Sequence, residues 1–95
     1  MTKTKRIHHF VDKKAIATSI DLYNKIEFCT GNYDVTWDTY WESLADICPT
    51  NSWAVRCAVS SIFQQMYFAN TLTVDRIYEL ILVSGVNTTE VQIDD

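Results

Sequence analysis

Apolar residues recur at helical spacing along four stretches of the chain, and the third stretch is the most hydrophobic. Its apolar positions cover most of the helical circumference: Trp53, Val55, Ala58, Val59, Ile62, Phe63, Met66 and Tyr67. A helix that is apolar on so many sides must be covered by other elements. The pattern therefore predicts a central helix over about residues 52–69, with the rest of the chain packed around it.

End signals place two helices before this one. Asp12 is a typical N-cap residue for a helix over residues 13–28, whose isoleucines fall on one face. A second helix is expected over about residues 36–47, because Pro49 cannot continue it.

The third and fourth helices carry their own caps. The third is capped by one of three adjacent polar residues: Thr50, Asn51 or Ser52. It ends near Asn70, which tolerates the left-handed conformation. Thr73 is the expected N-cap of the fourth helix, and Gly85 ends it at the C′ position.

Two interpretations remain for the segment between the first two helices. Residues 26–28 and 34–37 have the composition to pair as a short hairpin around Gly31. The other interpretation is a plain loop, which we favour because an isolated hairpin is only marginally stable.

The two ends of the chain are polar. Residues 1–11 are expected to form a flexible basic arm, and residues 87–95 an acidic tail. Val91 and Ile93 alternate with polar residues, so a short strand is the alternative for the tail. With two glycines and one proline in 95 residues, turns are scarce, and we expect one all-α domain, a compact bundle of about four helices.

Composition narrows the class of protein further. Apolar residues make up 47 % of the chain, enough for a real core. The three cysteines, Cys29, Cys48 and Cys57, follow no metal or redox spacing. We expect free, mostly buried thiols and a reducing, cytoplasmic location. No apolar run is long enough to span a membrane.

Charge is divided unevenly along the chain. Residues 1–14 carry five cations and one acid, a net of +4, whereas residues 15–95 carry three cations and eleven acids, a net of −8. The basic arm offers Lys3, Lys5 and Arg6 to phosphates, but the acidic body would repel a polyanion. Nucleic acid is therefore not an expected partner.

The second predicted helix carries a row of acids, each four residues from the next: Asp34, Asp38, Glu42 and Asp46. We call this row the acidic ridge. Neighbours in it stand about 6 Å apart along a helix axis, and each like-charged pair costs about 0.2–0.5 kcal/mol. Trp37 and Trp41 flank it. The ridge faces water, is bridged by Arg56 from another helix, or binds a basic partner.

Catalytic and cofactor chemistry have little support in the chain. His8 and His9 are adjacent, and neighbouring side chains diverge, so no metal site is expected. Asp75 and Glu79 lie one helical turn apart, a common arrangement on exposed helices. No glycine-rich phosphate loop is present. We expect no enzyme activity and no cofactor.

The charge and aromatic pattern favours a non-catalytic protein-binding domain. Its partner would be a basic surface on a nucleic-acid-handling protein, bound through the acidic ridge with Trp37 and Trp41. The spacing of the ridge is near that of phosphates along a nucleic-acid strand, so such an inhibitor or modulator would imitate the polyanion. Small phage inhibitors are similar in size and charge, an analogy without a motif behind it.

The alternative is a self-associating structural or adaptor domain held by apolar contacts. The central helix and the twelve aromatic residues exceed what thin neighbouring helices are expected to cover. A homodimer would then form through apolar residues of that helix: Trp53, Phe63, Tyr67 and Phe68. The competing expectation is a monomer with a well-filled core.

Overall fold

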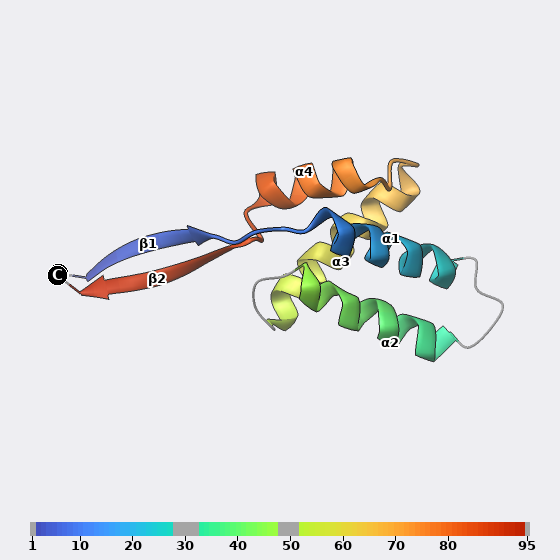
Figure 1. Ribbon diagram of the computed structural model, residues 1–95, viewed down its shortest axis with the longest axis horizontal. Helices are drawn as coiled ribbons and strands as arrows, with labels where there is room; N and C mark the ends of the chain where they lie inside the picture. Colours follow the sequence, from blue (N-terminus) through green and yellow to red (C-terminus); the bar gives the residue numbers. More distant parts are fainter. Residues whose placement is uncertain (1, 28–32, 48–51, 95) are drawn as a thin grey trace.

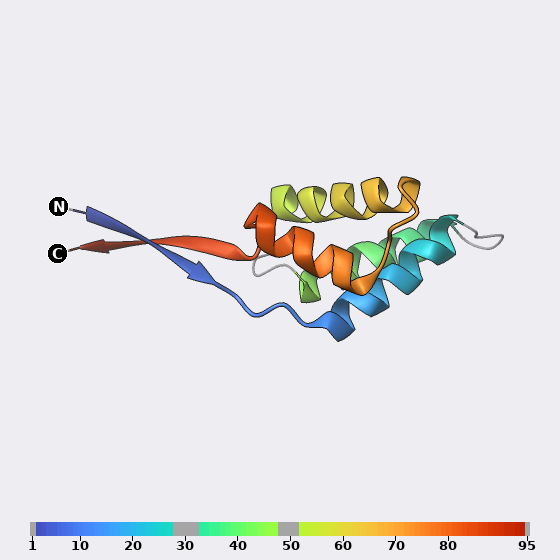
Figure 2. The same cartoon turned by 90° about the horizontal axis from the view of Figure 1, so that it is seen from above.

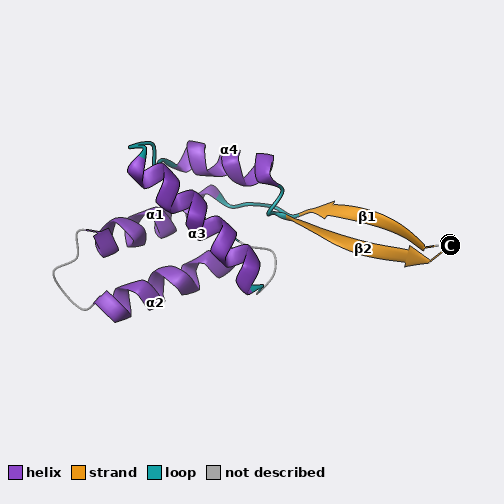
Figure 3. Ribbon diagram, turned by 180° about the vertical axis from the view of Figure 1, so that it is seen from behind, coloured by secondary structure: helices purple, strands orange, loops and turns teal. Residues whose placement is uncertain are grey.

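The computed structural model describes residues 2–27, 33–47 and 52–94, which form a helical body and a long two-stranded ribbon (Figures 1 and 3). The elements in chain order are β1 (Thr2–His8), α1 (Lys13–Glu27), α2 (Tyr33–Ser43), a 3₁₀ turn η1 (Leu44–Asp46), α3 (Trp53–Phe68), α4 (Val74–Ser84) and β2 (Thr88–Asp94). The molecule measures 56 × 24 × 20 Å because the ribbon projects from one end of the body. An all-α domain was predicted; the structure confirms a mostly helical chain with four helices and adds a small two-stranded sheet in its described part.

The helix at the centre of the body is α1, and the prediction that the third helix occupies the centre is wrong. In Figure 1, α1 lies between α2 on one side and α4 on the other. Five residues of α1 are buried: Ile16, Ser19, Ile20, Tyr23 and Ile26. By contrast, α3 buries only Val59 and Phe63.

The outer position of α3 is clearest when the body is viewed from above, where α3 runs along one side of α4 (Figure 2). Trp53 and Phe68, at the two ends of α3, are each 71 % exposed. The apolar residues around α3 predicted that this helix would be buried on several sides. Those on its outer face instead remain in contact with solvent.

Aromatic rings fill the middle of the core, and Tyr40 of α2 is the ring that joins the helices. Tyr40 has no exposed surface, and its ring centroid lies 5.3 Å from that of Tyr23 on α1 and 5.9 Å from that of Phe63 on α3. Its hydroxyl donates a 3.1 Å hydrogen bond to the Ser60 hydroxyl on α3. Burial of the ring and satisfaction of its polar tip therefore hold three helices together.

The predicted caps are confirmed where the structure describes them. Side-chain oxygens of Asp12, Ser52 and Thr73 accept backbone N–H hydrogen bonds two or three residues further on, at 2.9, 3.4 and 3.3 Å. Asn70 and Gly85 adopt left-handed conformations, with φ of 58° and 76°. Asn70 follows the end of α3 and Gly85 the end of α4, and both residue types tolerate the left-handed conformation.

The second helix differs from its prediction at both ends. It begins at Tyr33, about three residues early, and its last turn tightens into η1. The hairpin alternative is wrong, because Ile26 belongs to α1 and residues 34–37 belong to α2. The predicted loop, its centre Gly31, the stop at Pro49 and the caps Thr50 and Asn51 lie outside the described residues, as do Cys29 and Cys48.

The largest correction concerns the two ends of the chain. The arm and tail were predicted to be loose, with a short strand as the alternative for the tail. Instead, β1 and β2 pair antiparallel in one continuous register, from Thr2 opposite Asp94 to His8 opposite Thr88, so the strand alternative for the tail is the correct one. At the base of the ribbon, the His9 N–H donates to the Asn87 carbonyl at 2.8 Å. The Asn87 amide group donates to the His9 carbonyl at 3.1 Å.

The Tyr40 ring makes a testable contribution to stability. Tyr40→Ala is expected to lower the free energy of unfolding by about 3–5 kcal/mol, since it leaves a cavity at a fully enclosed site. Tyr40→Phe removes the hydrogen bond to Ser60, for which a loss of about 0.5–1.5 kcal/mol is expected. Urea unfolding followed by far-ultraviolet circular dichroism measures both.

Phe68→Ala is the matched control, because Phe68 is an aromatic side chain that is 71 % exposed. Its truncation is expected to cost about 0.5 kcal/mol or less. Equal losses for Tyr40→Ala and Phe68→Ala would contradict the central place given to Tyr40.

Candidate functional site

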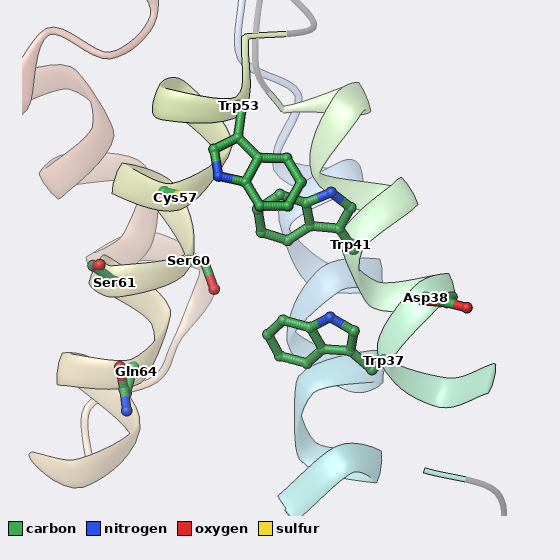
Figure 4. A pocket seen from close by; sticks show the side chains of 8 residues that line it. All are labelled: Trp37, Asp38, Trp41, Trp53, Cys57, Ser60, Ser61 and Gln64. Atoms are coloured by element: carbon green, nitrogen blue, oxygen red, sulfur yellow. The ribbon is translucent and has the colours of Figure 1, made fainter. Parts of the chain in front are cut away.

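An open groove of about 560 Å³ runs between α2 and α3 (Figure 4). Eight residues line it: Trp37, Asp38 and Trp41 from α2, and Trp53, Cys57, Ser60, Ser61 and Gln64 from α3. All three tryptophans of the chain are therefore in one place.

The three indole rings form a nearly continuous aromatic wall. Trp37 and Trp41 stack with their centroids 6.2 Å apart and their planes 20° apart. The ring of Trp53 extends from the first turn of α3 towards Trp41, and their centroids are 4.8 Å apart. Both α2 tryptophans are half-buried, so each presents one side to the groove.

Helical periodicity in α2 places the tryptophans beside the acids. Tyr40 and Leu44 point into the core, while Trp37 and Trp41 lie on the adjacent side, one turn apart. Asp38 stands at the rim of the groove, and Figure 4 shows its carboxylate directed away from the indoles.

The acidic ridge faces solvent. Asp34, Asp38, Glu42 and Asp46 are all exposed, the first three on α2 and the last in η1. Within residues 2–27, 33–47 and 52–94, none of these four carboxylates takes part in an ion pair. The guanidinium of Arg56, considered as a possible bridge, lies over the ring of Trp41, 6.0 Å from its centroid.

The ridge also accounts for the net charge of the chain. The protein has eight Lys and Arg residues and twelve Asp and Glu residues, a net of −4. Outside the four ridge acids, eight cations are left to balance eight acids. Since the segment of residues 33–47 contains no Lys or Arg, the excess negative charge is concentrated on one side of the body.

The residues predicted to mediate a homodimer are not all on the surface. Phe63 has no exposed area, so its prediction as a contact is wrong. Tyr67 is half-buried, and its ring packs at 5.6 Å against that of Tyr23. Trp53 and Phe68 are exposed, but Trp53 belongs to the groove.

Cys57 was predicted to be a buried thiol, and this prediction is wrong because Cys57 is exposed and lines the groove. The groove residues on α3 that were not predicted are Cys57, Ser60, Ser61 and Gln64. Small and polar residues at helical spacing on an otherwise apolar helix were the available signal, since they mark a face that the core does not cover.

The two acids considered as candidate catalytic groups, Asp75 and Glu79, form ordinary ion pairs at the surface. Asp75 pairs with Lys13 at 3.3 Å, and Glu79 pairs with Arg76 at 3.1 Å. In the described part of the chain, no group of three His, Cys, Asp or Glu side chains is placed to hold a metal ion. None of the helices there is both long and apolar enough to cross a membrane.

Comparison with known proteins finds no matching family model, no similar curated protein and no similar solved structure.

The electrostatic cost of the ridge is measurable. Glu42→Gln is expected to raise the free energy of unfolding by about 0.2–0.5 kcal/mol for each like-charged neighbour at low salt. The gain should shrink as salt screens the remaining charges. Urea unfolding at two ionic strengths measures it.

Glu79→Gln is the control with the same chemical change. It removes an ion pair with Arg76, so a loss of about 0.3–0.5 kcal/mol is expected instead of a gain. Destabilisation by Glu42→Gln would mean that a partner within the molecule holds this carboxylate.

Proposed function

We propose that this chain is a non-catalytic binding domain that receives a basic segment of another protein in the groove between α2 and α3. The observation that carries the proposal is the placing of three tryptophans beside four acids that form no ion pair among the described residues. Such an arrangement costs stability, and a cationic partner would relieve that cost.

The chemistry of the groove suits lysine and arginine side chains. Their aliphatic stems pack along apolar surface, and their charged ends remain near polar groups. Indole is the aromatic ring that attracts cations most strongly. The guanidinium of Arg56 already lies over Trp41, so an incoming side chain would lie along Trp37 and Trp53. It would have the carboxylates of Asp38 and Glu42 on the neighbouring side of α2.

The size of the groove supports contact with a few side chains of a larger surface. A volume of about 560 Å³ is within the range of small-ligand pockets, but the groove is open to solvent. Tryptophans at the middle of a contact commonly supply much of its binding energy, and charges around them set orientation and association rate.

Nucleic-acid-handling proteins are the partner class that we favour. They present lysine and arginine in rows that match a polyanion. A domain with its excess negative charge along α2 and η1 would cover such a row and exclude the nucleic acid, which makes the protein an inhibitor or modulator in this proposal.

Binding can be tested with the intact chain as bait in a lysate of its source at about 50 and 500 mM salt. The expected result is a captured protein with a basic surface that is lost at high salt. Asp38→Lys combined with Glu42→Lys should abolish capture, because it reverses the charge next to the tryptophans.

The matched control is Asp21→Lys combined with Glu79→Lys, which changes the net charge equally on α1 and α4. It should leave capture intact. If the ridge variant retains the same protein, or if capture is unchanged by salt, the ridge is not the contact and the proposal fails.

A further inference from the structure

The ribbon of β1 and β2 is unusual because it is a two-stranded sheet that projects into solvent, away from the helices. Among the described residues the sheet has two strands, and Figure 1 shows that it extends beyond the helices. A two-stranded ribbon is marginally stable by itself, and sheets gain independent stability from a third strand or a packed face. Strand edges also tend to pair with other strands.

The register divides the side chains of the ribbon between two faces. On one face, Lys3 lies opposite Ile93, Lys5 opposite Val91 and Ile7 opposite Thr89. This face, which we call the aliphatic face, carries three exposed aliphatic side chains: Ile7, Val91 and Ile93, which are 38, 42 and 41 % exposed. The other face is polar and includes the Arg6–Glu90 ion pair at 3.3 Å.

The strand β1 is unsuited to pairing with a second copy of itself. It carries three cations: Lys3, Lys5 and Arg6. A symmetric antiparallel pairing centred on any of residues 3–6 places two of these cations directly opposite one another. Like charges in that position destabilise a sheet, and lysines are a common protection of sheet edges.

The strand β2 has no such protection in its central register. A symmetric pairing centred on Val91 uses all seven residues of β2, and it sets Ile93 opposite Thr89 and Asp94 opposite Thr88 of the second copy. Glu90 then faces Gln92. Moving the centre by one residue, to Glu90 or Gln92, brings two acids directly opposite one another.

We propose that the chain forms a symmetric homodimer through β2, in which the two ribbons make one four-stranded antiparallel sheet with Val91 opposite Val91. The aliphatic faces of the two ribbons then join into a stripe of six side chains, with lysines on its two flanks. The apolar contacts and the second ladder of backbone hydrogen bonds supply what the single ribbon lacks.

The geometry of an antiparallel dimer keeps the helical bodies apart. Because the two copies of β2 run in opposite directions, the bodies lie at opposite ends of the shared sheet. The groove between α2 and α3 remains open in each copy. This interface replaces α3, with its buried Phe63, as the contact for self-association.

Disulfide trapping tests both the interface and its register. In a background in which Cys29, Cys48 and Cys57 are all replaced by Ser, so that no native thiol can crosslink, Val91→Cys is expected to form a covalent dimer of twice 11.0 kDa on mild oxidation. Opposite residues in antiparallel strands stand about 4.5–5.5 Å apart between Cα atoms, within the usual disulfide range.

Gln92→Cys in the same background is the matched control. Residue 92 would face residue 90 of the second copy, on the other side of the sheet, so no covalent dimer is expected. Crosslinking of Gln92→Cys as efficient as that of Val91→Cys would overturn the register and with it the proposal.

Sedimentation equilibrium of the unmodified chain provides an independent readout. The wild type should be dimeric. Val91→Lys should raise the dissociation constant of the dimer by roughly tenfold or more, because two lysines would meet at the symmetry axis. Thr4→Lys, an equal change on β1, should leave the dimer in place. If the wild type stays monomeric up to about 0.5 mM, its self-association is weaker than that of a specific interface. That result would overturn the proposal. A dimer lost in Phe68→Ala but kept in Val91→Lys would also overturn it.

Discussion

The helical body depends on the burial of one aromatic ring. Tyr40 contacts Tyr23 and Phe63 and donates its hydroxyl hydrogen bond to Ser60, so α1, α2 and α3 meet at a single side chain. A domain of this size has few such positions, because a short chain buries a limited share of its surface. Enclosing Tyr40 fixes the rotation of α2, and the rotation of α2 decides which of its residues reach solvent.

The candidate site follows from that rotation. With Tyr40 and Leu44 directed inward, the helical repeat places Trp37 and Trp41 on the side nearest α3. The acidic ridge is left on the exposed side. The Tyr40–Ser60 hydrogen bond joins the two helices that form the walls of the groove. The groove and the ridge are therefore parts of one surface, set by a residue that neither of them contains.

Local signals predicted the helices well, because a cap or a helical repeat acts within a few residues of its position in the chain. Asp12, Thr73 and Gly85 each perform the predicted role. The same signals did not predict which helix lies at the centre of the body. Hydrophobicity alone placed α3 at the centre, whereas the well-separated apolar and polar faces of α1 buried it more completely.

The ribbon could not be predicted from local patterns, because each of its strands obtains its partner from the other end of the chain. Val91 and Ile93 showed the alternation of a strand, but residues 1–11 showed mainly charge. The complementary signs of β1 and β2 were the available long-range signal. Arg6 and Glu90, 84 residues apart in sequence, form an ion pair at 3.3 Å.

Pairing of the ends changes the meaning of the charge distribution. Arg6 of β1 pairs with Glu90 of β2, whereas Lys3 and Lys5 lie opposite Ile93 and Val91. The basic residues of β1 and the acids of β2 therefore share one ribbon, so the basic arm is not a separate charged element that contrasts with an acidic body. The excess negative charge of the molecule therefore lies on α2 and η1. The molecule thus carries two surfaces of different physical kinds, the groove with its tryptophans and neighbouring acids and the edge of β2 with its aliphatic residues. We expect contacts at the first to weaken with salt more than contacts at the second. If both act as proposed, the dimer carries two grooves, and a partner with repeated basic segments would bind the pair more tightly than either groove alone.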